Sequence, residues 1–431
     1  MVNRGRGRPL PSNSEGSREG GTIRSQVSTT QTIPAGAESG SRFAIVMYGV
    51  LLLSYSVNAM DRQLFPVLAT DIRRDYGFSL ANIGLLSTIF TLGMAVAGLP
   101  TGYLLARFSR KAVLQMGIAI FSAGTALTAI ATGFSDMLIY RAATGLGEAM
   151  QLTVLLAIAA NYFIRYRGAA VGSVNFCFGI GAIAGPTLGG VLLTRYGSWK
   201  VPMIVFGGIG FLVIAVIAVA VRPWLSETRR AIQASADLRG APALLNRNTI
   251  LLTAMSMIGG LVIYSYLGMY PTFLREVLKF QPSAAGLVAS FYGLGALLSI
   301  GGGWVGDRLS PRLVMGAAFL STAILGYLLF NGSGAFAVQA TLSFLFGAVA
   351  SGLIYVNLAA YHVKAVQSTL TSRASGIFVT SFYTSAAAAG YLMGAISNNA
   401  GWVMAGEIQL SLLSLIGGGL ALALRTEQMS L

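Results

Sequence analysis

The stretch GYLLARFSRK, residues 102–111, recurs as GWVGDRLSPR at residues 303–312. Each copy follows the second apolar run of its half of the chain and ends in a short basic cluster. A repeat about 200 residues apart in an apolar chain predicts two related halves joined in one molecule. Where such halves meet, a substrate site is expected near the middle of the membrane.

Twelve apolar runs of membrane-spanning length surround the two copies. A transmembrane helix needs about 20 apolar residues, whereas a barrel strand needs only about 9–11. The runs therefore predict an all-α polytopic membrane protein with twelve transmembrane helices in two pseudo-symmetric six-helix bundles. The composition agrees, because 55% of the 431 residues are hydrophobic and only 10% are charged. The runs begin near Phe43, Ala81, Ala112, Met137, Ala169, Val201, Thr249, Ala284, Leu313, Ala335, Ala374 and Trp402.

The longest polar break, residues 222–248, divides the runs six and six. It predicts an N-terminal bundle over residues 43–222, a linker over 223–248 and a C-terminal bundle over 249–425. Residues 426–431 form a short cytoplasmic end. Residues 1–42 are rich in Ser, Gly, Thr and Arg, a composition that predicts a disordered tail. No signal peptide precedes the first apolar run.

The net charge of +15 would suit a nucleic-acid partner, but the positions of the charges argue otherwise. Of the 29 lysines and arginines, 21 fall in the tail and in the loops expected on one side of the membrane. That distribution follows the positive-inside rule. We therefore predict an integral protein of the cell (inner) membrane, with both termini and the linker cytoplasmic and no nucleic acid bound.

No P-loop, metal-ligand cluster or nucleophile triad is found in the sequence. We expect no cofactor and no metal, and a protein that is not an enzyme. The expected partners are a small-molecule substrate, protons and the lipid bilayer, and the expected state is a monomer. Cys177 is the only cysteine, which excludes an intrachain disulfide.

Several short motifs recur in the spans where one transporter family carries them. The loop pattern G-x-x-x-D-R-x-G-x-K/R is matched in the second half by Gly303, Asp307, Arg308, Ser310 and Arg312. In the first half it is matched by Gly102, Arg107, Arg110 and Lys111, with Ala106 in place of the acidic residue. The fourth span carries R-x-x-x-G-x-G-x-A at Arg141, Gly145, Gly147 and Ala149. The fifth span carries G-x-x-x-G-P-x-x-G-G at Gly181, Gly185, Pro186, Gly189 and Gly190.

Together these motifs resemble the major facilitator superfamily over nearly the whole chain after the tail. The resemblance implies that the loop residues gate the cytoplasmic side and that the fifth-span residues pack helices closely. Asn58–Arg62 (NAMDR) with Gly147–Ala149 (GEA) is similar to the anion:cation symporters and to the Spinster-like transporters. In those relatives the corresponding residues serve proton coupling and substrate binding. The Gly-Pro motif is instead associated with exporters and antiporters, so the direction of transport stays open.

Glu148 is the main candidate for a proton-coupling residue. It lies seven residues after Arg141, which places both on one helix face about 10 Å apart. A carboxylate near the middle of a membrane is costly and is expected to face a bundle interior or a watery cavity. A structural Arg141–Glu148 ion pair is the competing interpretation.

Asp61 and Arg62 are the second candidate pair. Adjacent helical residues point about 100° apart, so we expect Arg62 to face the cavity and Asp61 to contact a neighbouring helix. Asp61 is a second candidate for proton coupling, and charges at an outer helix end are the alternative. His362 is predicted at a loop edge and Glu407 at an outer helix end. The predicted substrate-binding residues are Arg62, Arg141, Asn58, Tyr55, Gln151, Asn175, Tyr264, Tyr266, Tyr292, Asn357 and Tyr383, with interhelical hydrogen bonding as the alternative for the polar ones.

These features predict a secondary active transporter that works by alternating access. We expect it to be coupled to protons and to carry a small organic anion such as a carboxylate, because two arginines are available to bind one. The first alternative is an exporter or antiporter of drugs or amphiphilic lipids. The second is a membrane sensor that does not transport. In the family pattern, the loop aspartate helps to hold the cytoplasmic side closed. Because Ala106 replaces this aspartate in the first half, we also expect a weakened outward-facing state.

Overall fold

The computed structural model describes residues 37–163, 167–227 and 240–429. Residues 1–36 of the predicted tail and residues 228–239 of the predicted linker lie outside the described residues. The described part of the chain is helical, apart from turns and one isolated bridge between Ala241 and Val366. An all-α fold is confirmed for these residues.

The helices of the first half match the first six apolar runs in order. They are α1 (Ala37–Tyr76), α2 (Leu80–Thr88), α3 (Phe90–Val96), α4 (Gly98–Arg107), α5 (Arg110–Thr128), α6 (Phe134–Tyr162), α7 (Arg167–Tyr196) and α8 (Lys200–Ala220). The short α9 (Pro223–Ser226) follows at the start of the predicted linker. In the second run, α2 and α3 pass into α4 across a bend of 50°.

The second half repeats this pattern with more interruptions. It comprises α10 (Arg247–Glu276), α11 (Pro282–Ala296), α12 (Ser299–Arg308), α13 (Pro311–Asn331), α14 (Phe336–Val349), the π-helix η1 (Ala350–Tyr355), α15 (Val356–Lys364), the 3-10 turn η2 (Ser368–Leu370), α16 (Thr371–Gly406), the π-helix η3 (Glu407–Leu412), α17 (Leu413–Leu422) and the 3-10 turn η4 (Thr426–Gln428).

The number of spans agrees with the predicted twelve once the long helices are divided. Ten helical stretches are long and apolar enough to cross a membrane, and the bent pair α2–α4 adds one more. The stretch Ser368–Leu422 has 55 residues, far more than the roughly 20 that a bilayer needs. Gly401 breaks it with φ 86°, in the left-handed region that favours glycine. Division at Gly401 is consistent with twelve spans in the described residues.

The repeated loop has the same local structure in both halves. Ser109 begins α5 and accepts a hydrogen bond from the amide of Ala112 at 3.2 Å. Ser310 begins α13 and accepts one from the amide of Leu313 at 3.4 Å. Serine is a preferred N-cap because its oxygen satisfies a free amide of the first turn. The position that holds glycine in the family motif therefore serves here as a helix cap.

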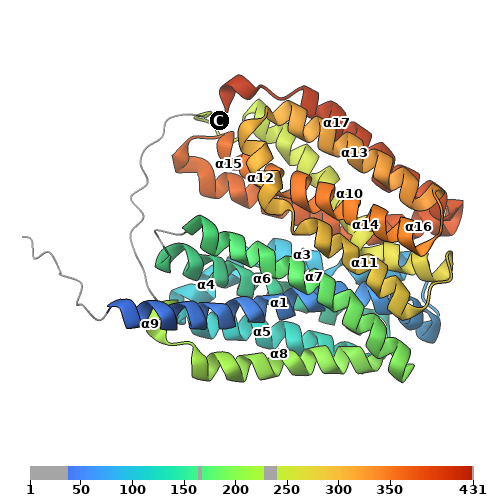
Figure 1. Ribbon diagram of the computed structural model, residues 1–431, viewed down its shortest axis with the longest axis horizontal. Coiled ribbons are helices and arrows are strands. Elements are labelled where there is room, and N and C mark those ends of the chain that lie inside the picture. The colour runs from blue at the N-terminus through green and yellow to red at the C-terminus, as the bar shows by residue number, and fades with distance from the viewer. Residues whose placement is uncertain (1–36, 164–166, 228–239, 430–431) are drawn as a thin grey trace, which may run out of the picture. The chain divides into compact units, whose positions relative to one another are not determined.

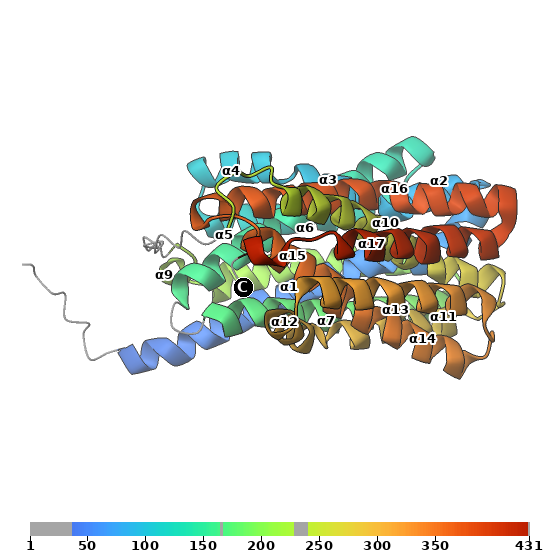
Figure 2. The same cartoon turned by 90° about the horizontal axis from the view of Figure 1, so that it is seen from above.

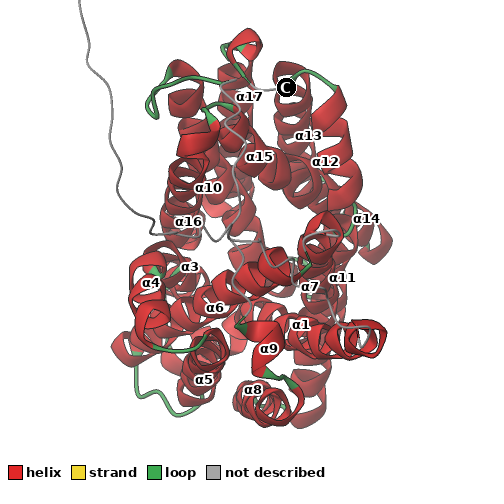
Figure 3. Cartoon of the chain, turned by 90° about the vertical axis from the view of Figure 1, so that its left-hand side faces the viewer, coloured by secondary structure: helices red, strands yellow, loops and turns green. Residues whose placement is uncertain are grey.

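Figure 1 shows the helices of the first half, blue to green, on one side and those of the second half, yellow to red, on the other. The two sets meet along two seams. At one seam α11 packs on α7, and at the other α16 packs on α2 and α3, as Figures 2 and 3 show. The division into two bundles with the predicted boundaries stays a prediction.

Close contacts between the halves gather toward the end of the molecule that the charge pattern predicts to be outside. A Cβ on Gly84 would lie 2.0 Å from the carbonyl oxygen of Gly390, so only glycine permits this approach of α2 and α16. Thr88 adds a hydrogen bond to the carbonyl of Ala387 at 2.9 Å. At the same end, Arg73 of α1 pairs with Glu276 of α10 at 2.8 Å. These contacts hold the predicted outer end closed.

Candidate functional site

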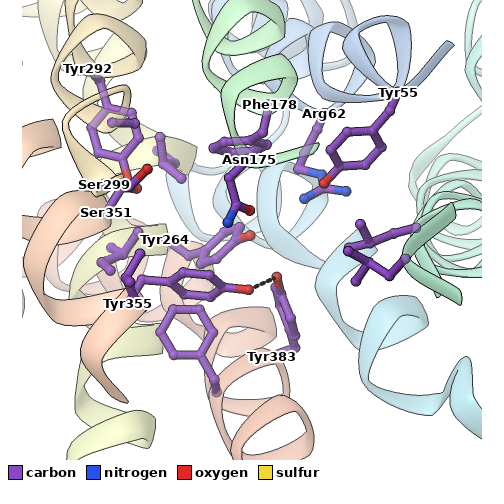
Figure 4. Close-up of a pocket in the computed structure, with 17 residues that line it drawn as sticks. Tyr55, Arg62, Asn175, Phe178, Tyr264, Tyr292, Ser299, Ser351, Tyr355 and Tyr383 are labelled. Carbon is purple, nitrogen blue, oxygen red and sulfur yellow. Dashed lines mark hydrogen bonds between the residues drawn. The ribbon is translucent and has the colours of Figure 1, made fainter. Parts of the chain in front are cut away.

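A cavity of about 130 Å³ lies between the two halves, with walls supplied by α1, α6, α7, α10, α11, α12, η1, α15 and α16 (Figure 4). Aromatic rings and aliphatic side chains make up most of its surface. Arg62 is the one charged side chain among its described lining residues. The lining consists of Tyr55, Arg62, Leu152, Leu156, Asn175, Phe178, Ile263, Tyr264, Leu267, Tyr292, Ala296, Ser299, Ser351, Tyr355, Val356, Phe382 and Tyr383.

Arg62 connects this cavity to a buried carboxylate. Its Nε donates to Oε2 of Glu148 at 3.1 Å, and both side chains are almost completely buried. Its Nη2 donates to Oδ1 of Asn58 at 3.0 Å. Tyr55, about two helical turns earlier on α1, lies beside the guanidinium at the cavity wall (Figure 4). The guanidinium is therefore shared between the cavity and Glu148.

Polar groups behind Arg62 fix α1 against α6. Asn58 donates to the backbone carbonyl of Glu148 at 3.2 Å and to Oε1 of Gln151 at 2.9 Å. Gln151 in turn donates to the hydroxyl of Ser54 at 2.9 Å. All of these side chains are buried. Buried networks of this kind hold side chains in fixed positions when each member has a partner.

One atom of this network has no partner. Oε1 of Glu148 is buried without a hydrogen bond. An ionised carboxylate in such a place carries a large desolvation cost, so this oxygen is where a proton would relieve the site.

Asp61 points away from Arg62, as the helical step between neighbouring residues predicts. Its Oδ2 accepts a hydrogen bond from the hydroxyl of Thr125 on α5 at 2.7 Å. Asp61 is 2% exposed. The two neighbours on α1 thus serve different surroundings, one facing α5 and the other facing α6 and the cavity.

The Arg141–Glu148 ion pair, the competing interpretation of this helix face, is absent from the described residues. Glu148 pairs with Arg62 instead. Arg141 does share a face of α6 with Glu148, but its Nε donates to the carbonyl of Leu86 at 3.4 Å. Its guanidinium lies over the rings of Phe65 and Phe90, at 4.7 and 5.2 Å from their centroids. The separation of two turns along α6 is too long for a direct bond, and α1 presents Arg62 closer to the carboxylate.

A set of tyrosines forms the wall opposite Arg62. The hydroxyls of Tyr355 and Tyr383 share a hydrogen bond of 3.1 Å, drawn as the dashed line in Figure 4. Tyr264 packs against Tyr383, with ring centroids 6.1 Å apart in an edge-to-face arrangement. Tyr292 shares a 2.5 Å hydrogen bond with Ser351. The cavity therefore offers flat apolar faces with hydroxyl groups at their edges.

Several predicted substrate-binding residues do not line this cavity. Tyr266 lies two residues after Tyr264, which turns it about 200° around α10. It bonds to Ser343 at 2.5 Å and stacks on Tyr270. Asn357 likewise lies two residues after Tyr355 and donates to the carbonyl of Gly302 at 3.1 Å. Together with Arg141, Asn58 and Gln151, these residues are buried between helices, away from the cavity surface.

The Major Facilitator Superfamily model matches residues 51–391, which is most of the chain. The chain belongs to the Major Facilitator Superfamily. It is a membrane transporter and not an enzyme, as the family and its named relatives are transporters.

Individual relatives of this transporter are distant. It is 24% identical over 344 residues to the 4-hydroxybenzoate transporter PcaK of Pseudomonas putida, covering 70% of this chain and 76% of the relative. It is 25% identical over 260 residues to Protein spinster of Drosophila melanogaster, covering 59% of this chain but only 43% of that protein.

Among solved structures, a bacterial homologue of the human lysosomal transporter Spinster, in an inward-facing and unoccupied conformation, matches with a TM-score of 0.68. That likeness has 16% identity and covers 88% of this chain and 95% of that one. The D323A mutant of the nucleoside transporter NupG matches with a TM-score of 0.72, 14% identity, and coverage of 88% and 99%. At these identities the likeness concerns the fold.

The predicted gating loops of this transporter make contacts within their own halves. Lys111 donates to the carbonyls of Ala218 and Val221 at 2.8 and 2.7 Å. Arg107 lies over the ring of Tyr103, and Arg308 lies over that of Trp304. Asp307 pairs with Lys364 at 2.7 Å, and Arg312 binds the carbonyl of Leu424. Gating by these residues, with Gly102, Arg110 and Gly303, stays a prediction.

Glu227 is a functional candidate that the sequence interpretation missed. Its carboxylate accepts the amides of Arg110 and Lys111 at 2.9 and 3.0 Å, at the start of α5. Partial burial alone would raise the pKa of Glu227. The two amides and the hydroxyl of Ser226 outweigh burial and hold this pKa below its usual value. A carboxylate at a helix N-terminus is also favoured by the helix dipole. Glu227 therefore ties the start of the linker to the gating loop.

The fifth-span glycines lie where α7 touches α1 and α11. A Cβ on Gly185 would lie 2.5 Å from the carbonyl oxygen of Met60, and one on Gly190 would lie 2.5 Å from that of Pro282. Gly181 and Gly189 similarly approach Ala59 and Leu64. The carbonyl of Pro186 approaches Gly286 of α11. The geometry suits the packing role that the family motif implies.

Two predicted end charges have different surroundings. Glu407 accepts a hydrogen bond from Asn331 at 3.3 Å in an exposed position, as expected for a helix end. His362 lies in the last turn of α15, next to the loop as predicted, but it is fully buried. Its Nδ1 bonds to the carbonyl of Leu358 at 2.8 Å, and its ring contacts Phe378. The packing of α16 against α15 covers it.

The lining residues that the sequence interpretation missed are mostly hydrophobic, such as Phe178, Phe382 and Leu156, or lie in η1. Apolar residues in an apolar helix give no sign of which one faces a cavity. The π-helix η1 brings Ser351 and Tyr355 to the cavity. π-Helical segments are rare overall, but those that occur are often found at functional sites. No recognised sequence pattern predicts where one will form. Among the described residues, no group of three or more His, Cys, Asp or Glu side chains is arranged to hold a metal.

Proposed function

We propose that this transporter moves a small organic anion together with a proton, by alternating access. Arg62 binds the carboxylate of the substrate, and Glu148 carries the proton. The observation that carries the proposal is the position of Arg62, which lines the cavity while its Nε is bonded to buried Glu148.

Charge balance supports this coupling. Among the residues that the structure describes, two arginines and two carboxylates are buried in the spans, Arg62 and Arg141 with Asp61 and Glu148, so their formal charges cancel. Protonation of Glu148 removes its hold on Arg62 and leaves one positive charge beside the cavity. An anionic substrate restores neutrality there. When the proton leaves, ionised Glu148 forms its ion pair with Arg62 again and displaces the anion. The anion and the proton therefore travel in the same direction.

The wall opposite Arg62 supports a substrate with a flat or hydroxylated body. Tyr264, Tyr355 and Tyr383 offer aromatic faces and hydroxyl groups, and Arg62 offers a planar fork that suits a carboxylate. Relatives of this chain are named as transporters of 4-hydroxybenzoate, of L-galactonate in Escherichia coli and of hexuronate in Bacillus subtilis. We propose a monocarboxylate with a ring or a short hydroxylated chain.

Proteoliposomes loaded with buffer and placed in an imposed pH gradient test the proposal. The probes are 4-hydroxybenzoate, L-galactonate and glucuronate, each measured with and without a protonophore. We expect at least one to accumulate, and the protonophore to abolish its accumulation. Failure of all three, and of a wider carboxylate panel in a thermal-shift screen, would contradict an anion substrate.

A matched pair of variants isolates Arg62. Arg62→Gln alone would leave Glu148 unpaired, so Glu148→Gln is compared with the double variant Glu148→Gln/Arg62→Gln. A hydrogen bond to a charged group contributes about 1.5–3 kcal/mol, so the double variant should bind the anion roughly 10- to 100-fold more weakly. Equal binding by the two variants would remove Arg62 from the substrate site.

Export of an amphiphile or drug is the second candidate. The predominantly apolar lining of the cavity favours it, and two relatives are named triacylglyceride transporters, at 29% and 28% identity over less than half of this chain. Uptake into inside-out and right-side-out vesicles separates this candidate from the first. Stimulation of transport by lipids and not by carboxylates would favour it.

A further inference from the structure

A second cavity, which is polar and has a volume of about 610 Å³, opens where α1 and α10 end at the predicted outer side. We name it the outer vestibule. It shares no lining residue with the cavity at Arg62. Its lining consists of Thr70, Arg73, Arg74, Gly77, Phe78, Arg275, Glu276 and Lys279.

Positive charge dominates this lining, with four cations against the single carboxylate of Glu276. Arg73 is paired with Glu276 at 2.8 Å, and Arg275 is paired with Asp71, which lies behind it on α1. Asp75, the remaining acidic residue of this turn, accepts the indole N–H of Trp199 at 2.6 Å. Arg74 and Lys279 are exposed and form no ion pair among the described residues.

Unpartnered hydrogen-bond donors lie in the same wall. Thr70 Oγ1, Arg73 Nε and Arg275 Nε are buried without a partner. Thr70 is 6% exposed and the Arg275 side chain is 9% exposed. Buried polar groups in folded proteins nearly always have a partner. These donors lie beneath the surface of the vestibule, so a ligand's acceptor oxygens reach them only when the Arg73–Glu276 and Arg275–Asp71 ion pairs open.

Lys279 adds an independent observation. It has φ 58°, in the left-handed region where glycine or asparagine usually ends a helix. Cations near the ends of α1 and α10 also complement the helix dipoles. That role does not require a lysine in a disfavoured backbone conformation at the rim of the vestibule.

We propose that the outer vestibule is an access site for organic carboxylates outside the closed cavity. An arriving carboxylate is drawn by Arg74 and Lys279 and then competes with Glu276 and Asp71 for Arg73 and Arg275. It thereby loosens the two ion pairs that join α1 to α10 at the closed end. The link to transport rests on the proposed function, whereas binding of the anion at the vestibule does not.

Charged thiol reagents measure the vestibule directly and need no knowledge of the transported solute. In a Cys177→Ser background, Thr70→Cys places one thiol in the vestibule at a position whose hydroxyl has no partner to lose. Ser333→Cys, exposed beyond α13 at the same end, is the control. The full-length protein in nanodiscs of neutral lipid is treated with anionic sulfonate and cationic trimethylammonium methanethiosulfonates of equal length.

We expect the ratio of anionic to cationic reaction rates to be higher at Thr70→Cys than at Ser333→Cys. Removing two unit charges from the vestibule, by Arg74→Gln with Lys279→Gln, should lower that ratio several-fold at low salt. Millimolar benzoate should slow the anionic reagent at Thr70→Cys and not at Ser333→Cys. Equal ratios at the two positions would overturn the proposal. So would a Thr70→Cys thiol that reacts with an uncharged methanethiosulfonate of the same size but not with the sulfonate, because a cavity that excludes a small sulfonate cannot admit a carboxylate.

Anionic lipid is the other source of such oxygens. Repeating the measurement in nanodiscs of anionic lipid distinguishes it. If the lipid alone protects Thr70→Cys and benzoate has no effect in neutral lipid, the vestibule is a headgroup site and the proposal is wrong.

Transport then tests the role of the vestibule. Arg74→Gln with Lys279→Gln should raise the KM for uptake from the vestibule side several-fold and leave the maximal rate unchanged. A changed maximal rate with an unchanged KM would contradict an access role. If the thiol measurements succeed but no carboxylate is transported, the proposed function fails while the anion site stands.

Discussion

Replacing Glu148 separates a proton carrier from a structural ion pair. Glu148→Gln keeps the size of the side chain and an acceptor oxygen for Arg62, but it carries no charge and cannot take up a proton. In the proposed mechanism it imitates the protonated state permanently. We expect it to bind and exchange the substrate with little loss and to abolish accumulation driven by a pH gradient.

The size of the expected effects on accumulation and on stability can be estimated. A proton and a monoanion that cross together carry no net charge, so only the pH difference drives accumulation, and each pH unit, worth about 1.4 kcal/mol, supports roughly tenfold accumulation of the solute. In Glu148→Gln that ratio should fall to about 1. Glu148→Ala should also lose stability, because it leaves Arg62 buried with Asn58 as its remaining acceptor. Removing one partner of a buried ion pair costs about 3–5 kcal/mol, and the Asn58 bond favours the lower end.

Proteoliposomes with an imposed pH gradient measure accumulation, and counterflow in the absence of a gradient measures exchange. Glu407→Gln, which changes an exposed carboxylate at a helix end, is the control and should behave as wild type. Full accumulation by Glu148→Gln would refute the assignment and would leave Glu148 as a structural ion pair. Asp61 would then be the better candidate for the proton site.

Four further predictions concern other residues. The double variant Asp61→Asn/Arg141→Gln should have a higher melting temperature than Arg141→Gln alone, because Arg141→Gln by itself leaves the buried charge of Asp61 without the positive charge that balances it. Equal melting temperatures would mean that Asp61 and Arg141 do not interact. Ala106→Asp should shift the population toward the outward-facing state, seen as shorter spin-label distances between the halves at the predicted cytoplasmic end; unchanged or longer distances would contradict it. The lowered pKa of Glu227 stabilises the folded protein at pH values above its ordinary pKa of 4.5, and this contribution is lost as the pH falls through the lower folded pKa, so Glu227→Gln should lower the melting temperature at pH 7, and the difference from wild type should shrink steadily as the pH falls below 4.5. Ser235, outside the described residues, should resist thiol labelling from outside intact cells when changed to cysteine, and labelling there would reverse the predicted topology.

The fold was predictable because its signals are long and repeated. Twelve apolar runs and a duplicated loop give the number of spans and the two related halves, and Ser109 and Ser310 begin equivalent helices in the structure. Breaks inside the spans were not predictable. The π-helices η1 and η3 and the bend between α3 and α4 lie inside predicted spans and have no recognised sequence signal, whereas the break at Gly401 coincides with the predicted start of the last span near Trp402.

The site was predictable at Arg62 and less so around it. The step of about 100° between adjacent helical residues correctly sent Asp61 to a neighbouring helix and Arg62 to the cavity. The same geometry, applied to Arg141 and Glu148, correctly placed them on one face but could not say which helix that face meets. The contact of α6 with α1 decided the partner of Glu148, and no pattern along α6 encodes that contact.

The two proposed anion sites work in the same way but differ in how deeply the carboxylate of the protein is buried. This difference in burial decides at which site a proton is needed. In each, a carboxylate of the protein holds the arginine that a ligand carboxylate would take. The Asp71 and Glu276 side chains are each 20% exposed, and ion pairs in contact with water contribute only about 0–1 kcal/mol. A soluble anion can therefore compete with them directly. Glu148 is 0% exposed, and breaking a buried pair without compensation costs about 3–5 kcal/mol. In the proposed mechanism, release of Arg62 therefore requires that Glu148 be neutralised first, which would confine proton coupling to the inner pair and leave the vestibule to gather the anion.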